Sequence, residues 1–131
     1  MAKSTESENL AKFIAELIIQ KKGEDVKIMD LRNLTGVTDF FVICSASSDV
    51  QNKAIADFIV DETKKLGQKA WHNEGYGNLS WVLIDFVDVV VHIFLTETRR
   101  FYNLEGLWGD AEITMVKDKI KAVRQKKSSD K

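Results

Sequence analysis

The sequence contains no proline, a single cysteine and only two histidines among its 131 residues. Without proline, every tight turn has to rely on Gly, Asn, Asp or Ser. The lone cysteine, Cys44, cannot form an internal disulfide, which indicates a protein of the reducing cytoplasm. No apolar run approaches the ~18 residues that a membrane-spanning helix needs, and residues 1–8 lack the apolar core of a secretory signal. These absences predict a cytoplasmic protein that is not embedded in a membrane.

Charge is unevenly distributed along the chain, although the net charge is only -1. Residues 117–131 carry seven basic and two acidic side chains, a balance of +5, which leaves -6 for residues 1–116. We therefore expect one folded domain over residues 1–116 and a basic, frayed C-terminal tail over residues 117–131. An acidic body suits a basic protein partner and argues against a broad phosphate-binding surface, so no membrane or sequence-specific nucleic acid is expected as a partner.

Hydrophobic periodicity predicts alternating helices and strands. Apolar residues recur every three or four positions in two segments, one after Thr5 and Glu8 and one after Ser48 and Gln51, and both pairs have capping-box spacing. A further helical or irregular segment is expected over residues 98–108, followed by a frayed helix. Shorter apolar or alternating runs predict five strands, at residues 26–31, 40–44, 81–85 and 89–95 and from residues 69–71 onward.

The resulting order of elements is αββαβββα, which predicts one domain of the α/β (α+β) class. Only residues 86–88 separate the last two strands, so an antiparallel hairpin is the economical connection. We therefore expect a single mixed five-stranded sheet with helices packed against it.

Side chains that commonly carry chemistry are few and scattered. His72 and His92 are 20 residues apart, and neither has a second ligand three or four positions later, so no metal site and no cofactor is predicted. Cys44 alternates with Phe40 and Val42 along an apolar segment, which predicts a small buried hydrophobe rather than a nucleophile.

The best enzymatic alternative is a metal-dependent nucleotidyltransferase that uses Asp39, Asp85 and Asp88. Carboxylates at strand ends hold magnesium in phosphoryl and nucleotidyl transfer. However, the chain has no Asp-x-Asp pair that would place two carboxylates on one strand face, and two of the three aspartates flank the predicted hairpin. Turn formation and solvation explain these residues better than metal binding does.

Aromatic residues concentrate in one part of the chain, with eight of the twelve between residues 71 and 108. Along the last predicted strand, Val90, His92 and Phe94 share one face, while the opposite face is wholly aliphatic. Such a mixed face fits a partly covered docking surface, because Trp, Tyr, Phe and Arg are prominent at protein–protein interfaces. Two ordinary cores with a histidine at the rim fit the pattern equally well.

Several blocks of the sequence resemble the Iojap family of ribosomal silencing factors. They follow the family's order and nearly its spacing across residues 8–110, and blocks in register are more specific than one short motif. The blocks are TDFFVICSASS at 38–48, AIAD at 54–57, EG at 74–75, WVLID at 81–85, DVVVHIF at 88–94 and RRFYNLEGLW at 99–108.

This resemblance implies a fold similar to nucleotidyltransferases without a working catalytic site, and hence a protein that is not an enzyme. It also implies docking on an L14-family ribosomal protein of the large ribosomal subunit, where the bound factor blocks subunit joining and lowers translation when nutrients are scarce. Members of the family can form homodimers. By position, the family's partner-contacting residues fall on Trp81, Phe86, His92, Phe94, Arg100 and Tyr102. We expect Trp81 and Phe94 to be exposed, with His92 between them.

Overall fold

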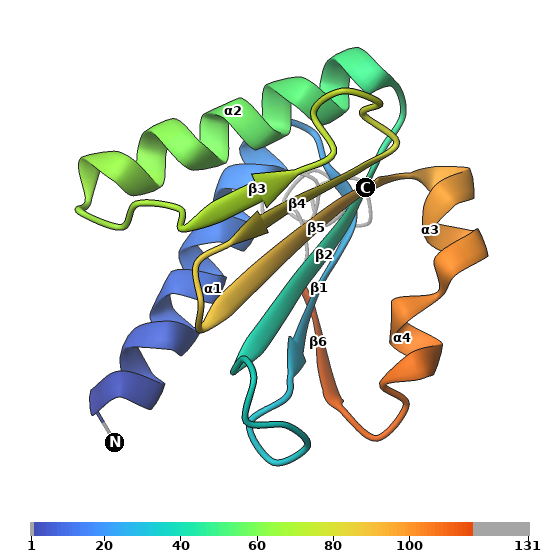
Figure 1. Ribbon diagram of the computed structural model, residues 1–131. Helices are drawn as coiled ribbons and strands as arrows, with labels where there is room; N and C mark the ends of the chain where they lie inside the picture. Colours follow the sequence, from blue (N-terminus) through green and yellow to red (C-terminus); the bar gives the residue numbers. More distant parts are fainter. Residues whose placement is uncertain (1, 117–131) are drawn as a thin grey trace, which may run out of the picture.

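Helices lie on both faces of one mixed β-sheet in the computed structural model, which describes the backbone of residues 2–116 and the side chains of residues 6–116 (Figure 1). The basic tail predicted over residues 117–131 lies outside the described residues. In chain order the elements are α1 (Ala2–Gln20), β1 (Glu24–Asp30), β2 (Phe40–Ala46), α2 (Asp49–Lys65), β3 (His72–Glu74), β4 (Trp81–Asp85), β5 (Val89–Leu95), α3 (Thr96–Tyr102), α4 (Leu104–Leu107) and β6 (Glu112–Val116).

The sheet has six strands in the order β3-β4-β5-β2-β1-β6. Strands β2 and β5 pair in parallel, and all other neighbours pair antiparallel, including the predicted β4–β5 hairpin. The mixed α/β class is therefore confirmed, but the prediction of five strands is wrong. Strand β6 lies where a frayed helix was expected, because Glu112–Val116 finds a pairing partner in β1, more than 80 residues earlier.

Helices α1 and α2 cover one face of the sheet and enclose the larger core (Figure 1). On α2 the buried residues include Asn52 and Thr63, while the apolar Val50 in the first turn is 76% exposed. The polar pair is satisfied inside the core: the Asn52 side-chain amide donates to the carbonyl of Leu79 (2.8 Å), and the Thr63 hydroxyl donates to the carbonyl of Ile59 (2.7 Å). The fully buried apolar side chains here include Ile14, Ile18, Val42, Cys44, Ile55, Ile59, Val82, Ile84, Val91 and Ile93.

Helices α3 and α4 lie on the opposite face and cover only part of it (Figure 1). They complete a smaller core built on the buried residues Met29, Leu31, Ile43 and Phe94. Leu104, Trp108 and Ala111 from the α3–α4 region pack against these residues, together with Phe41 and Trp81 from the sheet. The two faces therefore differ: two long helices cover one face, and two short helices cover only part of the other.

The helix ends follow local chemistry where the sequence signal was specific. Ser48 caps α2 by accepting from the amide of Gln51, as predicted. Helix α1 instead begins at Ala2, so the predicted start after Thr5 is too late. Within the described part of the chain, no helix is both long and apolar enough to cross a membrane.

Candidate docking face

The partly covered sheet face displays a set of aromatic and aliphatic side chains, which we call the docking face. Strand register explains its composition, because residues paired directly across neighbouring strands project to the same side of a sheet. Leu83 pairs with His92, and Val90 pairs with Phe41, so side chains from β4, β5 and β2 meet on this side. The docking face consists of Phe41, Trp81, Leu83, Val90 and His92, bordered by Tyr102 of α3 and by Trp108.

Trp81 is the centre of the aromatic contacts on the docking face. Its ring centroid lies 4.9 Å from that of Phe94 and 4.6 Å from that of Tyr102, both in tilted geometries. Trp81 remains half-buried, and Tyr102 is 49% exposed. Both side chains are therefore held in position by their neighbours and still expose part of their surface to solvent, which is typical of aromatic residues at protein–protein hot spots.

His92 lies beneath this cluster and is only 4% exposed. Burial lowers the pKa of His92 to about 3, so the imidazole is neutral at physiological pH. The indole N–H of Trp81 donates to Nδ1 of His92 at 3.1 Å, which assigns the proton of the neutral ring to Nε2. The Phe41 ring meets His92 edge-on at 4.5 Å. His92 thus orients Trp81 and contributes no charge to the surface.

Phe94 corrects one sequence expectation, because it is fully buried rather than exposed. It belongs to the smaller core, where Leu104 and Trp108 pack against the same cluster. The sequence placed Phe94 on the correct side of its strand, but periodicity within a strand does not show what lies above it. In this structure Phe94 supports Trp81 and Tyr102 from below.

The structure brings four of the six candidate residues together and places the other two elsewhere. Trp81, His92, Phe94 and Tyr102 come together on one side of the sheet. Phe86 instead packs at the edge of the larger core, against the opposite face. Arg100 is exposed on α3.

The sequence did not lead to Phe41 and Leu83 of the docking face, or to Trp108 on its border. Phe41 and Leu83 carried a usable signal. Phe41 lies between Phe40 and Val42 and therefore faces the opposite side, and Leu83 follows Trp81 by two residues and therefore shares its face. Trp108 carried none, since its position depends on how the chain after β5 folds back over the sheet. Its ring lies 6.1 Å from that of Phe41, at nearly a right angle.

The rim of the docking face is acidic on the β3–β4 side. His72 pairs with Asp85 and Glu74 pairs with Leu83, so all four side chains project to the same side as His92. The imidazole of His72 lies 3.2 Å from the carboxylate of Glu74. An apolar centre with carboxylates at its border is the layout of a protein-binding surface that favours a basic partner.

The three aspartates of the enzymatic alternative each take part in a hydrogen bond within the fold. The carboxylate of Asp39 accepts from the Ser7 hydroxyl (2.8 Å), and that of Asp85 accepts from the amide of Val87 in the hairpin (2.7 Å). The carbonyl of Asp88 accepts from the amide of Asp39. Among the described residues, no three His, Cys, Asp or Glu side chains group as metal ligands would.

Cys44 is fully buried on the face of the sheet that α1 and α2 cover, which confirms the prediction made from its alternation. Burial raises the pKa of the Cys44 thiol to about 12. The thiolate is the reactive form of cysteine, so this thiol is chemically inert at physiological pH.

Comparison with known proteins points to one family. A family described as "Ribosomal silencing factor during starvation" matches residues 4–131. A ribosomal silencing factor from Bacillus subtilis is 40% identical over 105 residues, which cover 80% of this chain and 89% of that protein. The mouse protein "Mitochondrial assembly of ribosomal large subunit protein 1" is 30% identical over 99 residues, 73% of this chain but only 43% of its own length.

Solved structures show the same arrangement of helices and strands. A crystal structure of a protein from Chromobacterium violaceum superposes with a TM-score of 0.76 at 32% sequence identity and covers 78% of this chain and 85% of its own. A protein from Bacillus halodurans superposes with a TM-score of 0.68 at 35% identity over 86% of this chain and 98% of its own.

Proposed function

The chain belongs to the ribosomal silencing factor family, and from that premise we propose that it represses translation by docking on the large ribosomal subunit and blocking its joining to the small subunit. The contact on the large subunit is an L14-family ribosomal protein, and the site of action is the cytoplasm. The observation that carries the proposal is the docking face, a sheet surface with aromatic side chains that no other part of the described chain fully covers.

The chemistry of the docking face supports a protein partner. Trp81 and Tyr102 are preorganised by mutual contact, so little side-chain entropy is lost when a partner covers them. Glu74 and Asp85 place carboxylates at the rim, which complements the basic surface expected of a ribosomal protein. The name of the mouse relative refers to the large ribosomal subunit, in agreement with this choice of partner.

The proposed mechanism is steric and requires no catalytic group. A body of this size bound at the intersubunit face occupies space that the small subunit needs, so repression follows from occupancy alone. The strength of repression is then set by the affinity for the large subunit and by the concentration of the factor. The homodimer that the family resemblance implies stays a prediction, which sedimentation of the free protein tests.

Site-specific crosslinking tests this proposal. A photoreactive phenylalanine analogue replaces Tyr102 on the border of the docking face, and a matched variant carries the same group in place of Lys53 on α2, on the opposite side of the sheet. After illumination with isolated large subunits, we expect position 102 to crosslink to an L14-family protein and position 53 to give no such product. Crosslinking to small subunits alone, or equal crosslinking from both positions, would contradict the proposal.

A further inference from the structure

The α3–α4 segment is tied to the sheet by a partly buried ionic cluster centred on Arg99. Helix α3 has seven residues and α4 has four, lengths at which an isolated helix is unstable in water. The segment borders the docking face, because Tyr102 contacts Trp81 and Trp108 contacts Phe41. Its position must therefore come from tertiary contacts, and these contacts also determine the shape of the docking face.

Arg99 supplies the most extensive of these contacts. It is the exception on an otherwise mostly exposed helix, with 6% of its surface accessible. One terminal nitrogen donates to the carbonyl of Asp25 (2.7 Å) and to the hydroxyl of Ser45 (3.0 Å). Nε and the other terminal nitrogen donate to the two carboxylate oxygens of Glu105 (3.3 and 3.0 Å), and this second nitrogen also lies 3.5 Å from the Asp25 carboxylate.

The partners of Arg99 come from three different elements. Asp25 lies at an irregularity in β1, where its φ of 50° takes the backbone out of the regular strand conformation. Ser45 belongs to β2, and Glu105 belongs to α4. The cluster also includes Lys27 of β1, whose ammonium nitrogen lies 3.1 Å from a carboxylate oxygen of Glu105. One guanidinium thus ties α3 to α4 and ties both helices to the neighbouring strands β1 and β2.

Charge and geometry make this arrangement specific to arginine. A bidentate pair with a carboxylate needs the planar fork of a guanidinium, and a lysine ammonium cannot reach several fixed oxygens at once. Burial raises the pKa of Glu105, but hydrogen bonds from Arg99 and Lys27 outweigh this effect and hold the pKa below its usual value. The carboxylate of Glu105 is therefore ionised at physiological pH, and removal of either member of the pair leaves the other poorly compensated in a partly buried site.

We propose that Arg99 is a positioning residue for ribosome docking: through Glu105, Ser45 and Asp25 it holds the α3–α4 segment where Tyr102 and Trp108 complete the docking face. This inference rests on the proposed function and extends it. Arg99 itself needs no contact with the ribosome. Its contribution to affinity comes from preorganisation, because a segment that is already fixed does not have to be ordered when the partner binds.

The test measures affinity for isolated large subunits in three variants, Arg99→Met, Arg99→Lys and Glu105→Gln, alongside the wild-type protein. We expect each variant to raise the dissociation constant by about tenfold or more. Ile59→Val is the matched control, since it removes a methyl group from the core under α2 and leaves the docking face unchanged. We expect the control to bind with wild-type affinity.

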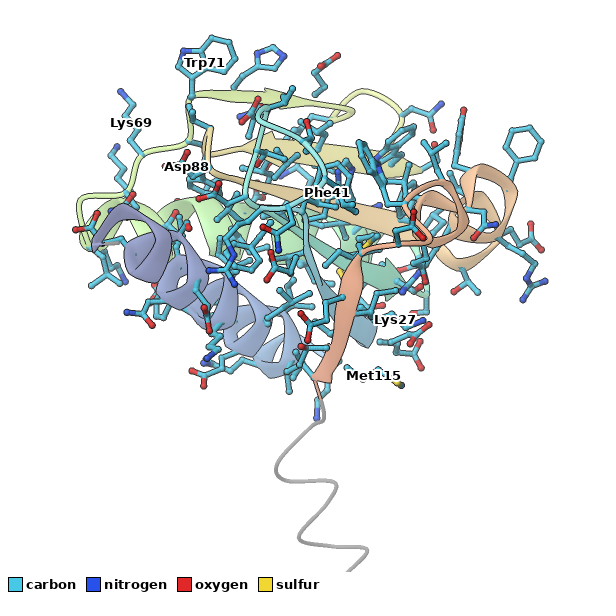
Figure 2. The ribbon with its side chains drawn as sticks, turned by 90° about the horizontal axis from the view of Figure 1, so that it is seen from below. Lys27, Phe41, Lys69, Trp71, Asp88 and Met115 are labelled. Atoms are coloured by element: carbon cyan, nitrogen blue, oxygen red, sulfur yellow. The ribbon has the colours of Figure 1, made fainter. Side chains whose placement is uncertain are left out.

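A spectroscopic measurement separates positioning from general destabilisation. Trp71 is 73% exposed and projects from the β3 side of the molecule, whereas Lys27 of the ionic cluster lies towards the opposite edge (Figure 2). In nuclear magnetic resonance spectra, the Arg99 variants should shift the indole N–H signals of Trp81 and Trp108 and leave that of Trp71 in place. Ile59→Val should not shift the signals of Trp81 and Trp108.

Wild-type affinity in both Arg99→Lys and Glu105→Gln would overturn the inference, as would indole signals of Trp81 and Trp108 that stay unchanged in the folded variants. Should Arg99→Met not fold, the conservative Glu105→Gln variant carries the test. A wild-type protein that fails to bind large subunits would instead refute the proposed function, while the indole signals would still show whether Arg99 positions the α3–α4 segment.

Discussion

His92 is a titratable side chain that folding keeps uncharged. It accepts a hydrogen bond from the indole of Trp81 while aromatic rings and the two neighbouring strands surround it. Burial without a compensating negative charge lowers its pKa, so the folded state resists protonation that the unfolded state accepts. A docking face built around a neutral histidine should bind its partner with little pH dependence near neutrality.

The pKa of His92 predicts how stability depends on pH. The pKa is about 6.5 in the unfolded chain and about 3 in the folded protein, so below about pH 6.5 the unfolded state binds more protons and stability falls with falling pH. Between about pH 7 and pH 5, this one group should cost about 2 kcal/mol of unfolding free energy. Urea titrations of wild type and His92→Gln should show a pH dependence that is weaker in the variant by about this amount; equal pH dependence in the two proteins would contradict the assignment.

Phe94 should contribute strongly to stability, because the α3–α4 segment buries a side chain that the strand periodicity alone left exposed. Because it is fully enclosed between the sheet and the α3–α4 segment, Phe94→Ala should leave a cavity and lower the unfolding free energy by ~3–5 kcal/mol. Denaturant unfolding measures this loss, and Phe101→Ala, at a position 81% exposed on α3, is the control with a small expected effect. A loss below about 1 kcal/mol for Phe94→Ala would mean that the helices do not cover this side chain.

At the scale of elements, the connection between β3 and β4 depends on one glycine. Gly75 has a φ of +95°, and a Cβ placed there would lie 1.9 Å from the carbonyl oxygen of Trp81. Gly77, two residues later, has open space around it. The backbone at Gly75 therefore needs both the conformational freedom and the small size of glycine, and Gly77 needs neither to the same degree.

This contrast predicts that Gly75→Ala lowers the unfolding free energy by at least about 2 kcal/mol, from the strained backbone and the clash with a neighbouring strand. Gly77→Ala should change it by less than about 0.5 kcal/mol. Thermal or urea unfolding of the two variants checks the prediction. Equal stability of the two would show that β4 does not approach Gly75 as closely as the structure has it.

The elements that could be predicted from the sequence are those that local chemistry specifies. The strands around Val42, Ile84 and Val91 were predictable because apolar runs of this length are buried, and the Ser48 cap was predictable because its spacing is specific. Strand β6 was missed because the segment Glu112–Val116 is short and its strand partner β1 is distant in sequence. Its three β-branched residues, Ile113, Thr114 and Val116, carried a strand signal. Asn52 was likewise missed, because a buried amide is satisfied by carbonyls distant in sequence.

At the scale of the whole molecule, the protein divides its two sheet faces between stability and recognition. The α1–α2 face holds most of the fully buried apolar side chains, and the other face keeps Phe41, Trp81 and Leu83 partly uncovered beside a small core. Of the docking face, the sequence located the strand positions and the aromatic content. Alternation from Trp81 also indicates that Phe86 faces the opposite side. The sequence could not show that the α3–α4 segment covers Phe94 or that Arg99 holds this segment in place.

The joining of ribosomal subunits, followed by light scattering, tests the central claim most directly. Large subunits are incubated with saturating factor before small subunits are added, and Trp81→Ala serves as the matched variant, with an expected loss of ~2 kcal/mol or more in binding, about thirtyfold in affinity. We expect the wild-type factor to suppress joining strongly and Trp81→Ala to require a correspondingly higher concentration. Joining that proceeds unchanged at saturating wild-type factor would contradict the account.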